Sequence, residues 1–403
     1  MIGLIPGTFI SPLWGQVYLP EGGNIKVGSL EIHPSLSFQE TYSSNIYQNY
    51  AGLPASSGYI SALTPAVKLQ LPVARHQFFA EYRADFNFYS VDSESNYIQQ
   101  KAGAGTKLSF GRNLDISLVY YYTVSEIPRL AKSQFGNQLN GFNLDSRPFA
   151  QNYIKGLIGW SFADRWRVEG LYDFSSYRFK NNIDFFSNND TPSYGGKIYY
   201  RFTSKISGFG EYTYSVITYP DDPGFSNTSQ FAFLGMAFDP TAKLRGELKV
   251  GYQNKKYDHS QAGRADSLSG TAMDINLIRL ISDYTRLKLL LNRRIADDVT
   301  TNAPYTENKV GLELKHYWSR NEKFSGTLRG GYSTLSFDGK TEDIDGSFKN
   351  RDDRRWELGI ALGYDFRRWL MMSLGYSYTN NDSNFINYNF SENRVFFNIQ
   401  ASF

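Results

Sequence analysis

The sequence predicts an all-β protein, a single transmembrane antiparallel β-barrel of about 18 strands with an aqueous lumen and both termini in the periplasm. The first of three observations is an alternation of apolar and polar side chains that recurs in short segments along the chain. The second is that 41% of the 403 residues are hydrophobic and 16% aromatic, yet no apolar run reaches the roughly 18 residues of a membrane-spanning helix. The third is that short turns alternate with longer polar loops.

The last strand shows the alternation clearly. Successive side chains of a strand point to opposite faces, so the strand from Val395 to Phe403 has one apolar and one mostly polar face. The apolar face carries Val395, Phe397, Ile399, Ala401 and Phe403, and the other carries Phe396, Asn398, Gln400 and Ser402. A final strand that ends in an aromatic residue resembles the assembly signal of outer-membrane β-barrels. We therefore expect Phe403 to be recognised by the barrel-assembly machinery.

The connections between strands fall into two kinds. Eight short turns centre on Pro72–Arg75, Gly111–Asn113, Ala163–Arg165, Thr203–Lys205, Asp239–Ala242, Ser282–Tyr284, Arg320–Glu322 and Phe366–Arg368. Nine longer loops cover residues 43–58, 90–96, 129–148, 181–191, 220–228, 259–267, 300–305, 338–353 and 380–391. The segments between them are long enough for the roughly 9–11 residues of a tilted membrane-spanning strand. Together they predict eighteen strands.

Several of these segments alternate regularly. The clearest are Leu114–Val124, Trp166–Phe174, Lys243–Tyr252 and Trp356–Phe366, each with apolar residues on one face and charged or polar residues on the other. The segments 230–238 and 268–281 alternate less regularly, so the sequence does not fix their register.

Aromatic residues flank the predicted short turns, as expected for rings at a membrane–water boundary. The tryptophans of this periplasmic girdle are Trp160, Trp166, Trp318 and Trp369. A soluble propeller or solenoid is the competing fold, but the chain shows no sequence repeat. We therefore expect a location in the bacterial outer membrane, in contact with the lipid bilayer and lipopolysaccharide.

The domain organisation is simple. Residues 29–403 form the predicted barrel, and residues 1–28 are either a periplasmic segment or the remnant of a signal peptide. Met1–Gly15 is mildly apolar, but no basic residue precedes Lys26, as a complete signal would require. Cysteine is absent, so the chain has no disulfide or thiolate site.

Basic residues outnumber acidic ones on the predicted inward faces. Rings of Lys and Arg favour anions in a pore, although these charges could instead pair across neighbouring strands. The residues assigned to the lumen or substrate path are Lys107, Lys155, Arg167, Lys197, Arg201, Lys243, Arg245, Lys249, Lys288, Lys315, Arg329 and Arg355.

The longest internal loop, residues 129–148, is long enough to have a function of its own. One hypothesis is that it folds inward as a constriction loop, with Arg129, Lys132 and Arg147 near the path. The other is that it is a solvated surface loop.

Other kinds of site have weaker support. His259, next to Asp258 and Ser260, is the one histidine placed for chemistry near the outer leaflet, and a solvated loop histidine is the simpler interpretation. The carboxylates of Asp338–Gly346 lack the spacing of a calcium-binding loop. The sequence therefore predicts no enzyme, no metal site and no cofactor, and its interspersed charges give no support for nucleic-acid binding.

The stretch from Val27 to Tyr47 resembles the start of the Putative beta-barrel porin type 2 family. The matching residues are Gly28, Pro34, Leu36, Tyr42, Asn45 and Ile46. This resemblance implies an outer-membrane barrel of exopolysaccharide export clusters, with a periplasmic polysaccharide-export protein as its partner. It assigns no substrate site to individual residues.

Three functions remain open. The first is a channel that passes an anionic exopolysaccharide out of the periplasm. The second is a passive or substrate-selective diffusion porin for small anions or sugars, and the third is a structural barrel that holds a periplasmic or surface partner. Fold alone does not separate them.

Overall fold

The computed structural model describes residues 25–50, 52–127, 147–180, 187–239, 243–260, 264–298, 303–318, 323–343 and 346–403. Its elements are almost all strands. They are β1 (Ile25–Val27), β2 (Leu30–Ser43), β3 (Gly58–Val73), β4 (His76–Tyr89), β5 (Tyr97–Phe110), β6 (Leu114–Ile127), β7 (Arg147–Phe162), β8 (Trp166–Phe179), β9 (Asn189–Arg201), β10 (Ile206–Ile217), β11 (Asn227–Phe238), β12 (Leu244–Tyr257), β13 (Ser267–Ser282), β14 (Thr285–Asp297), β15 (Pro304–Tyr317), β16 (Phe324–Glu342), β17 (Phe348–Arg367), β18 (Leu370–Ser383) and β19 (Phe390–Ser402), with short 3₁₀ helices at Ser93–Ser95, Pro223–Phe225 and Ile386–Tyr388. No helix among the described residues is long and apolar enough to cross a membrane.

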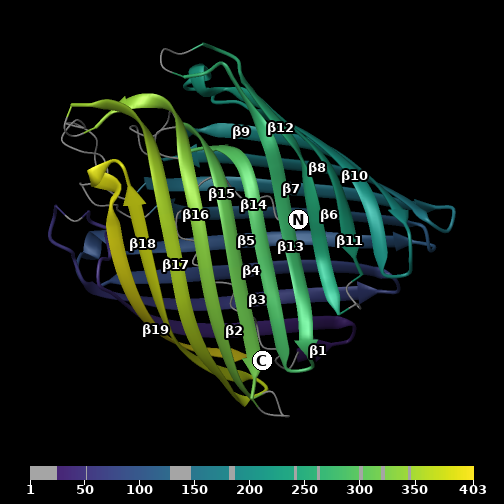
Figure 1. The fold of residues 1–403 in the computed structure, drawn as a ribbon. Coiled ribbons are helices and arrows are strands. Elements are labelled where there is room, and N and C mark those ends of the chain that lie inside the picture. Colours follow the sequence, from purple (N-terminus) through teal and green to yellow (C-terminus); the bar gives the residue numbers. More distant parts are fainter. Residues whose placement is uncertain are drawn as a thin grey trace.

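The eighteen long strands, β2 to β19, form a closed antiparallel barrel (Figure 1). Each pairs with its neighbours in the chain, and β19 closes the ring by pairing with β2, from Arg394↔Ser43 to Ser402↔Ser35. Beyond this seam, the N–H of Phe403 donates to the carbonyl of Pro34 at 2.9 Å. The short strand β1 then pairs with the start of β2. The predicted fold class is therefore confirmed.

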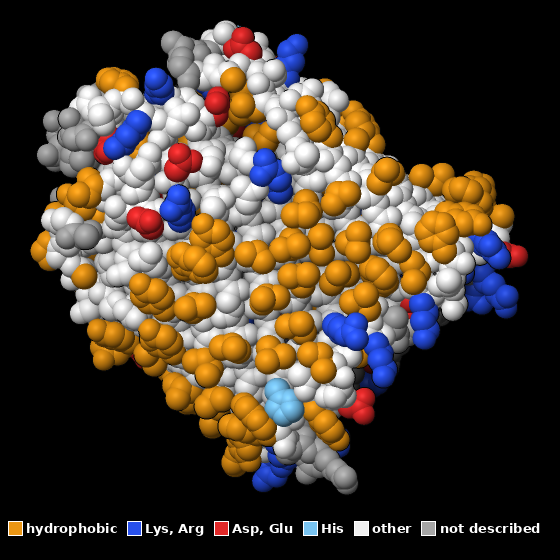
Figure 2. All heavy atoms as spheres, in the orientation of Figure 1, with side chains coloured by type: hydrophobic (Ala, Val, Ile, Leu, Met, Phe, Trp, Pro, Cys, Tyr) orange, Lys and Arg blue, Asp and Glu red, His pale blue; other side chains and the backbone are white. Residues whose placement is uncertain are grey.

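Side chains alternate between the two faces of the barrel wall. Residues directly opposite each other on paired strands point to the same face of the sheet. Once one residue is known to face outward, the pairing register therefore identifies the outward residues of every other strand. Leu362, Leu374 and Phe397 lie opposite one another on β17, β18 and β19, and all three are exposed on the outer face. Figure 2 shows the result as a broad band of hydrophobic side chains, with charged side chains gathered beyond its two edges.

Six of the eight predicted short turns lie between consecutive strands of the described structure, and Arg320–Glu322 and most of Asp239–Ala242 lie outside the described residues. The predicted loop at 338–353 is too long, because β16 continues to Glu342 and β17 begins at Phe348. After a register shift, pairing continues at Lys340↔Asn350. The polar residues of this extension are typical of a loop. Paired strands that are surrounded by water need no apolar face, however, so polar residues can form them. The less regular segments at 230–238 and 268–281 belong to β11 and β13. β11 pairs with both of its neighbours without a register shift, and β13 has one shift, between Leu280 and Ser282 in its pairing with β14.

Aromatic rings line the short-turn end of the barrel. Trp160 contacts Phe162 with ring centroids 5.1 Å apart, Phe162 stacks on Trp166 at 6.5 Å, and Trp166 meets Tyr200 at 4.8 Å. Farther round, Trp318 contacts Phe324, and Trp369 stacks on Phe403 at the seam. All four tryptophans assigned to the girdle are exposed, which is the arrangement expected at a membrane boundary.

Candidate functional site: the lumenal wall

Most residues assigned to the substrate path lie on the inward face. By strand pairing this face contains Lys107, Lys155, Arg167, Lys197, Arg201, Arg245, Lys249, Lys288, Lys315, Arg329 and Arg355. Lys243 differs, since it precedes the first residue of β12 and is exposed. Two of the predicted constriction residues, Arg129 and Lys132, lie outside the described residues. The backbone of Arg147 pairs with Ile127 at the start of β7, and its side chain also lies outside the described part.

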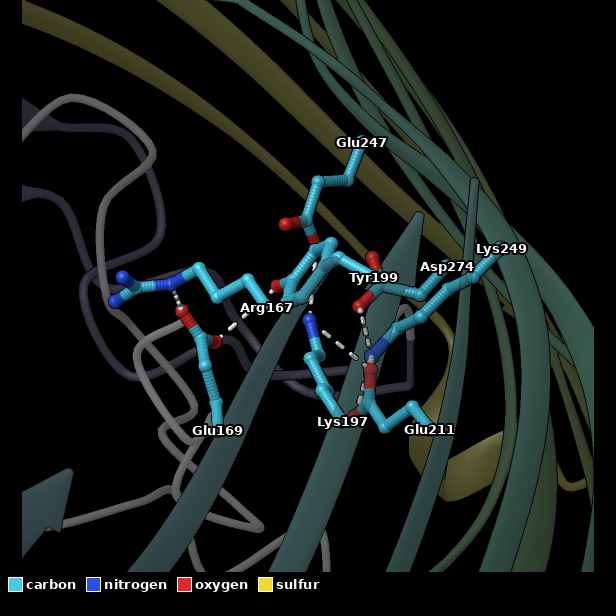
Figure 3. Close-up of polar contacts among 8 residues, drawn as sticks. All are labelled: Arg167, Glu169, Lys197, Tyr199, Glu211, Glu247, Lys249 and Asp274. Atoms are coloured by element: carbon cyan, nitrogen blue, oxygen red, sulfur yellow. Dashed lines mark hydrogen bonds and ion pairs between the residues drawn. The ribbon is translucent and has the colours of Figure 1, made fainter. Parts of the chain in front are cut away.

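A set of seven charged side chains and one tyrosine runs across the inner wall from β8 to β13 (Figure 3). We call it the lumenal ladder. Its members are Arg167, Glu169, Lys197, Tyr199, Glu211, Glu247, Lys249 and Asp274. It alternates in sign, which brings each charge next to an opposite one.

Glu211 is the centre of the ladder. One of its carboxylate oxygens lies 3.1 Å from Nζ of Lys197, and the other lies 3.0 Å from Nζ of Lys249. The side chains of Glu211 and Lys249 are only 6% and 4% exposed. Ion pairs with so little water around them are held by geometry and mutual attraction, because removing either charge leaves the other desolvated.

The two ends of the ladder are more open to solvent. On one side Arg167 binds Glu169 at 2.8 Å and Asp115 at 3.2 Å, and the hydroxyl of Tyr199 donates to Glu169. On the other side, Lys197 also contacts Glu247 at 3.1 Å. The chain of contacts ends where Lys249 approaches Asp274 at 3.7 Å.

The ladder crosses β11 without a charge from that strand. Gly235 lies opposite both Phe209 and Lys249. A Cβ atom at Gly235 would lie 2.4 Å from the Phe209 ring and 2.9 Å from Cβ of Lys249, so only glycine leaves the space for Lys249 to reach β10. The ammonium of Lys249 also lies 4.5 Å from the Phe233 ring centroid, within cation–π distance.

Other inward charges divide into paired and unpaired groups. Arg329 binds Glu313 at 2.7 Å, and Arg83 binds Asp85 at 2.6 Å. In contrast, no carboxylate among the described residues lies within 4.0 Å of the ammonium groups of Lys107, Lys288 or Lys309. The pairing expected between neighbouring strands therefore accounts for part of the basic surplus and leaves these three lysines unpaired in the described structure.

A second cluster lies on the inward side near the long loops, and the sequence did not point to it. We call it the rim cluster. Its apolar part consists of Ala296, Tyr305, Leu335 and Phe337. Arg351 lies between the rings of Phe337 and Tyr388, 4.3 Å and 3.3 Å from their centroids. It also binds Asp353. In the loop, burial raises the pKa of the Tyr388 hydroxyl, with Arg351 opposing the rise.

The residues considered for catalysis or metal binding do not form a cluster. The carbonyl of His259 accepts a hydrogen bond from Arg264. Asp338 accepts from the backbone of Ala265, and Asp343 pairs with Lys349 at 2.7 Å. Within the described part of the chain, no group of three or more His, Asp or Glu side chains could hold a metal ion.

Comparisons with known proteins give a family match and several structures of similar outer-membrane proteins. The family model described as Putative beta-barrel porin 2 matches residues 18–403. Among solved structures, the outer membrane protein OpdK from Pseudomonas aeruginosa is 11% identical, with 92% of this chain and 99% of that chain covered and a TM-score of 0.49. OccK2 (OpdF) from the same organism is 12% identical, with 92% and 98% covered and a TM-score of 0.48. Acinetobacter baumannii OccAB4 is 13% identical, with 92% and 98% covered and a TM-score of 0.47. Comparison with curated proteins finds no match.

Proposed function

Because the chain belongs to the Putative beta-barrel porin 2 family, we propose that it is a substrate-selective diffusion channel for small anionic and sugar-like solutes. The protein is an outer-membrane β-barrel with a porin-like channel architecture. Barrels of roughly 16–18 strands leave a water-filled lumen. The family and the fold thus support a channel, and the charged and aromatic side chains of the lumenal wall support its selectivity.

The three unpaired inward lysines carry the proposal. Lys288 and Lys309 are on the neighbouring strands β14 and β15, and Lys107 is on β5 in another part of the ring. An unpaired ammonium keeps its full charge available to a passing anion, whereas an ion pair presents a dipole. Within a low-dielectric wall such charges concentrate anions in the pore.

Aromatic rings beside lysines support the sugar-like part of the proposal. Nζ of Lys101 lies 3.9 Å from the Tyr121 ring centroid, and Nζ of Lys68 lies 5.8 Å from that of Phe79. A flat ring contacts the apolar face of a sugar, and the neighbouring ammonium attracts a carboxylate. A sugar acid combines the two groups that this wall accommodates.

Export of an anionic exopolysaccharide stays a prediction. A polymer needs an open bore along its whole length, and the rim cluster packs Tyr305, Phe337 and Arg351 on the inward side near the long loops. That packing favours small solutes over a chain. Deleting the gene and measuring secreted polymer tests export separately: lost polymer secretion with unchanged uptake of small solutes would favour the exporter.

The selectivity is tested in planar bilayers and proteoliposomes. We expect the wild-type channel to prefer chloride over potassium and to pass galacturonate faster than galactose. The triple variant K107Q/K288Q/K309Q should lose most of both preferences while keeping its conductance. The matched control R112Q/K205Q/R368Q removes three exposed charges from short turns and should keep them. A wild-type preference for cations would overturn the proposal.

A further inference from the structure

An apolar groove of about 450 Å³ opens on the outward face of the barrel near the short turns of β8 to β11. Its walls come from the rings of Trp166, Tyr200 and Phe202 on one side and from Leu234 and Met236 on the other. The groove lies on the opposite side of the wall from the lumenal ladder. Nothing in the channel function requires it.

Gly210 forms the open floor of the groove, whereas the ring of Phe202 covers Gly208, where a Cβ atom would lie 2.6 Å from that ring. Gly208 and Gly210 on β10 share the outward face with Tyr200 and Ile198, which lie directly opposite them on β9. A Cβ atom at Gly210 would lie 3.8 Å from both Ile198 and Leu234, so these side chains flank an open floor. Leu234, on one side of this floor, is 73% exposed.

The short-turn end of the groove is basic. The guanidinium of Arg165 donates to the hydroxyl of Tyr200 at 3.4 Å, which places this cation beside the aromatic wall. Lys205, in the next short turn, is also exposed. The groove therefore runs from a cationic, hydrogen-bonding end into a purely apolar interior.

We propose that this groove binds one glycerophospholipid of the periplasmic leaflet. Short turns of outer-membrane barrels face the periplasm, and the aromatic girdle marks the headgroup level there. One acyl chain lies over Gly210, between Ile198 and Leu234, and the phosphate is bound by Arg165 and Lys205. Guanidinium–phosphate pairs are strong, charge-assisted contacts. A second copy of the chain could fill the apolar part, but it would leave the two cations without an anion.

The test is native mass spectrometry of the full chain in mild detergent, with phosphatidylglycerol as the probe and diacylglycerol as the phosphate-free comparison. The variant G210F puts a ring into the groove. Its matched control is G156F, because Gly156 is also outward and a Cβ atom there would have no neighbour closer than 4.0 Å. The variant R165Q removes the proposed phosphate contact, and R112Q removes an equivalent charge from another short turn.

We expect the wild-type barrel and both control variants to retain one phosphatidylglycerol. G210F should bind it about tenfold more weakly, which corresponds to about 1.4 kcal/mol. R165Q should weaken phosphatidylglycerol binding and leave diacylglycerol binding unchanged. No retained lipid, an equal loss in G156F, or a dimer that G210F dissociates would overturn the proposal, the last in favour of a contact between copies.

Discussion

At the scale of single residues, the lumenal wall depends on how strongly each charge is desolvated. Lys249 and Glu211 are almost completely buried, whereas the side chain of Glu247 is 35% exposed. The same kind of contact, an ammonium about 3 Å from a carboxylate, therefore has different consequences at the two positions. The burial of an ion pair, and not its contact distance, therefore decides how much its loss destabilises the barrel.

Replacing Lys249 with methionine should destabilise the barrel by about 3–5 kcal/mol, because Glu211 loses a buried cationic partner. The measurement is the free energy of unfolding by urea in lipid vesicles. The control E247Q removes an exposed partner of Lys197 and should cost about 0–1 kcal/mol. Equal losses in the two variants would show that the ladder is solvated throughout.

At the scale of strands, the alternation assigns every side chain to lipid or lumen. On β18, Leu374 is outward between Leu362 and Phe397, while its neighbour Ser373 is inward between Gly363 and Asn398. A shift of one residue in pairing would exchange the two faces. Adjacent positions on one strand therefore make a sensitive test of the register.

Leu374→Arg should cost about 2–4 kcal/mol, the range for a cation on the lipid face near the middle of the bilayer. Ser373→Arg should cost little, since the lumen is wet and no basic side chain lies directly opposite. The folded fraction of each variant in vesicles, measured by heat-modifiable electrophoretic mobility, gives the comparison. The reverse order of the two losses would place β18 in the opposite register.

At the scale of the whole molecule, closure creates the channel and its field. The barrel exists only because β19 pairs with β2, which joins the two ends of the described chain. Closure also brings unpaired lysines from β5, β14 and β15 around one lumen, where their fields add. The net charge of the chain is only +3, so selectivity reflects how charges are distributed and not their sum.

If that field produces the selectivity, salt should weaken it. The screening length falls from about 10 Å at 0.1 M salt to about 3 Å at 1 M. The chloride-to-potassium permeability ratio, measured from reversal potentials, should therefore fall towards one over this range. A ratio that does not change with salt would indicate direct binding at a narrow site.

The sequence by itself determined most of the strands, the short turns of the described structure and the two faces of the wall. These features are local: alternation has a period of two residues, and a turn involves only a few neighbours, so Leu114–Val124 or Phe366–Arg368 could be recognised without the rest of the chain. The inward position of residues such as Arg167 and Lys249 followed from the same rhythm.

Only the tertiary structure decided which charges meet and where the wall is open. Glu211 reaches Lys249 across Gly235, Arg351 lies against Tyr388, and the groove needs Gly210 beside Ile198 and Leu234. Each arrangement joins side chains from different strands or loops, and its contacts depend on pairing register and side-chain reach in three dimensions. Alternation assigns a residue to a face, but it does not specify its neighbours.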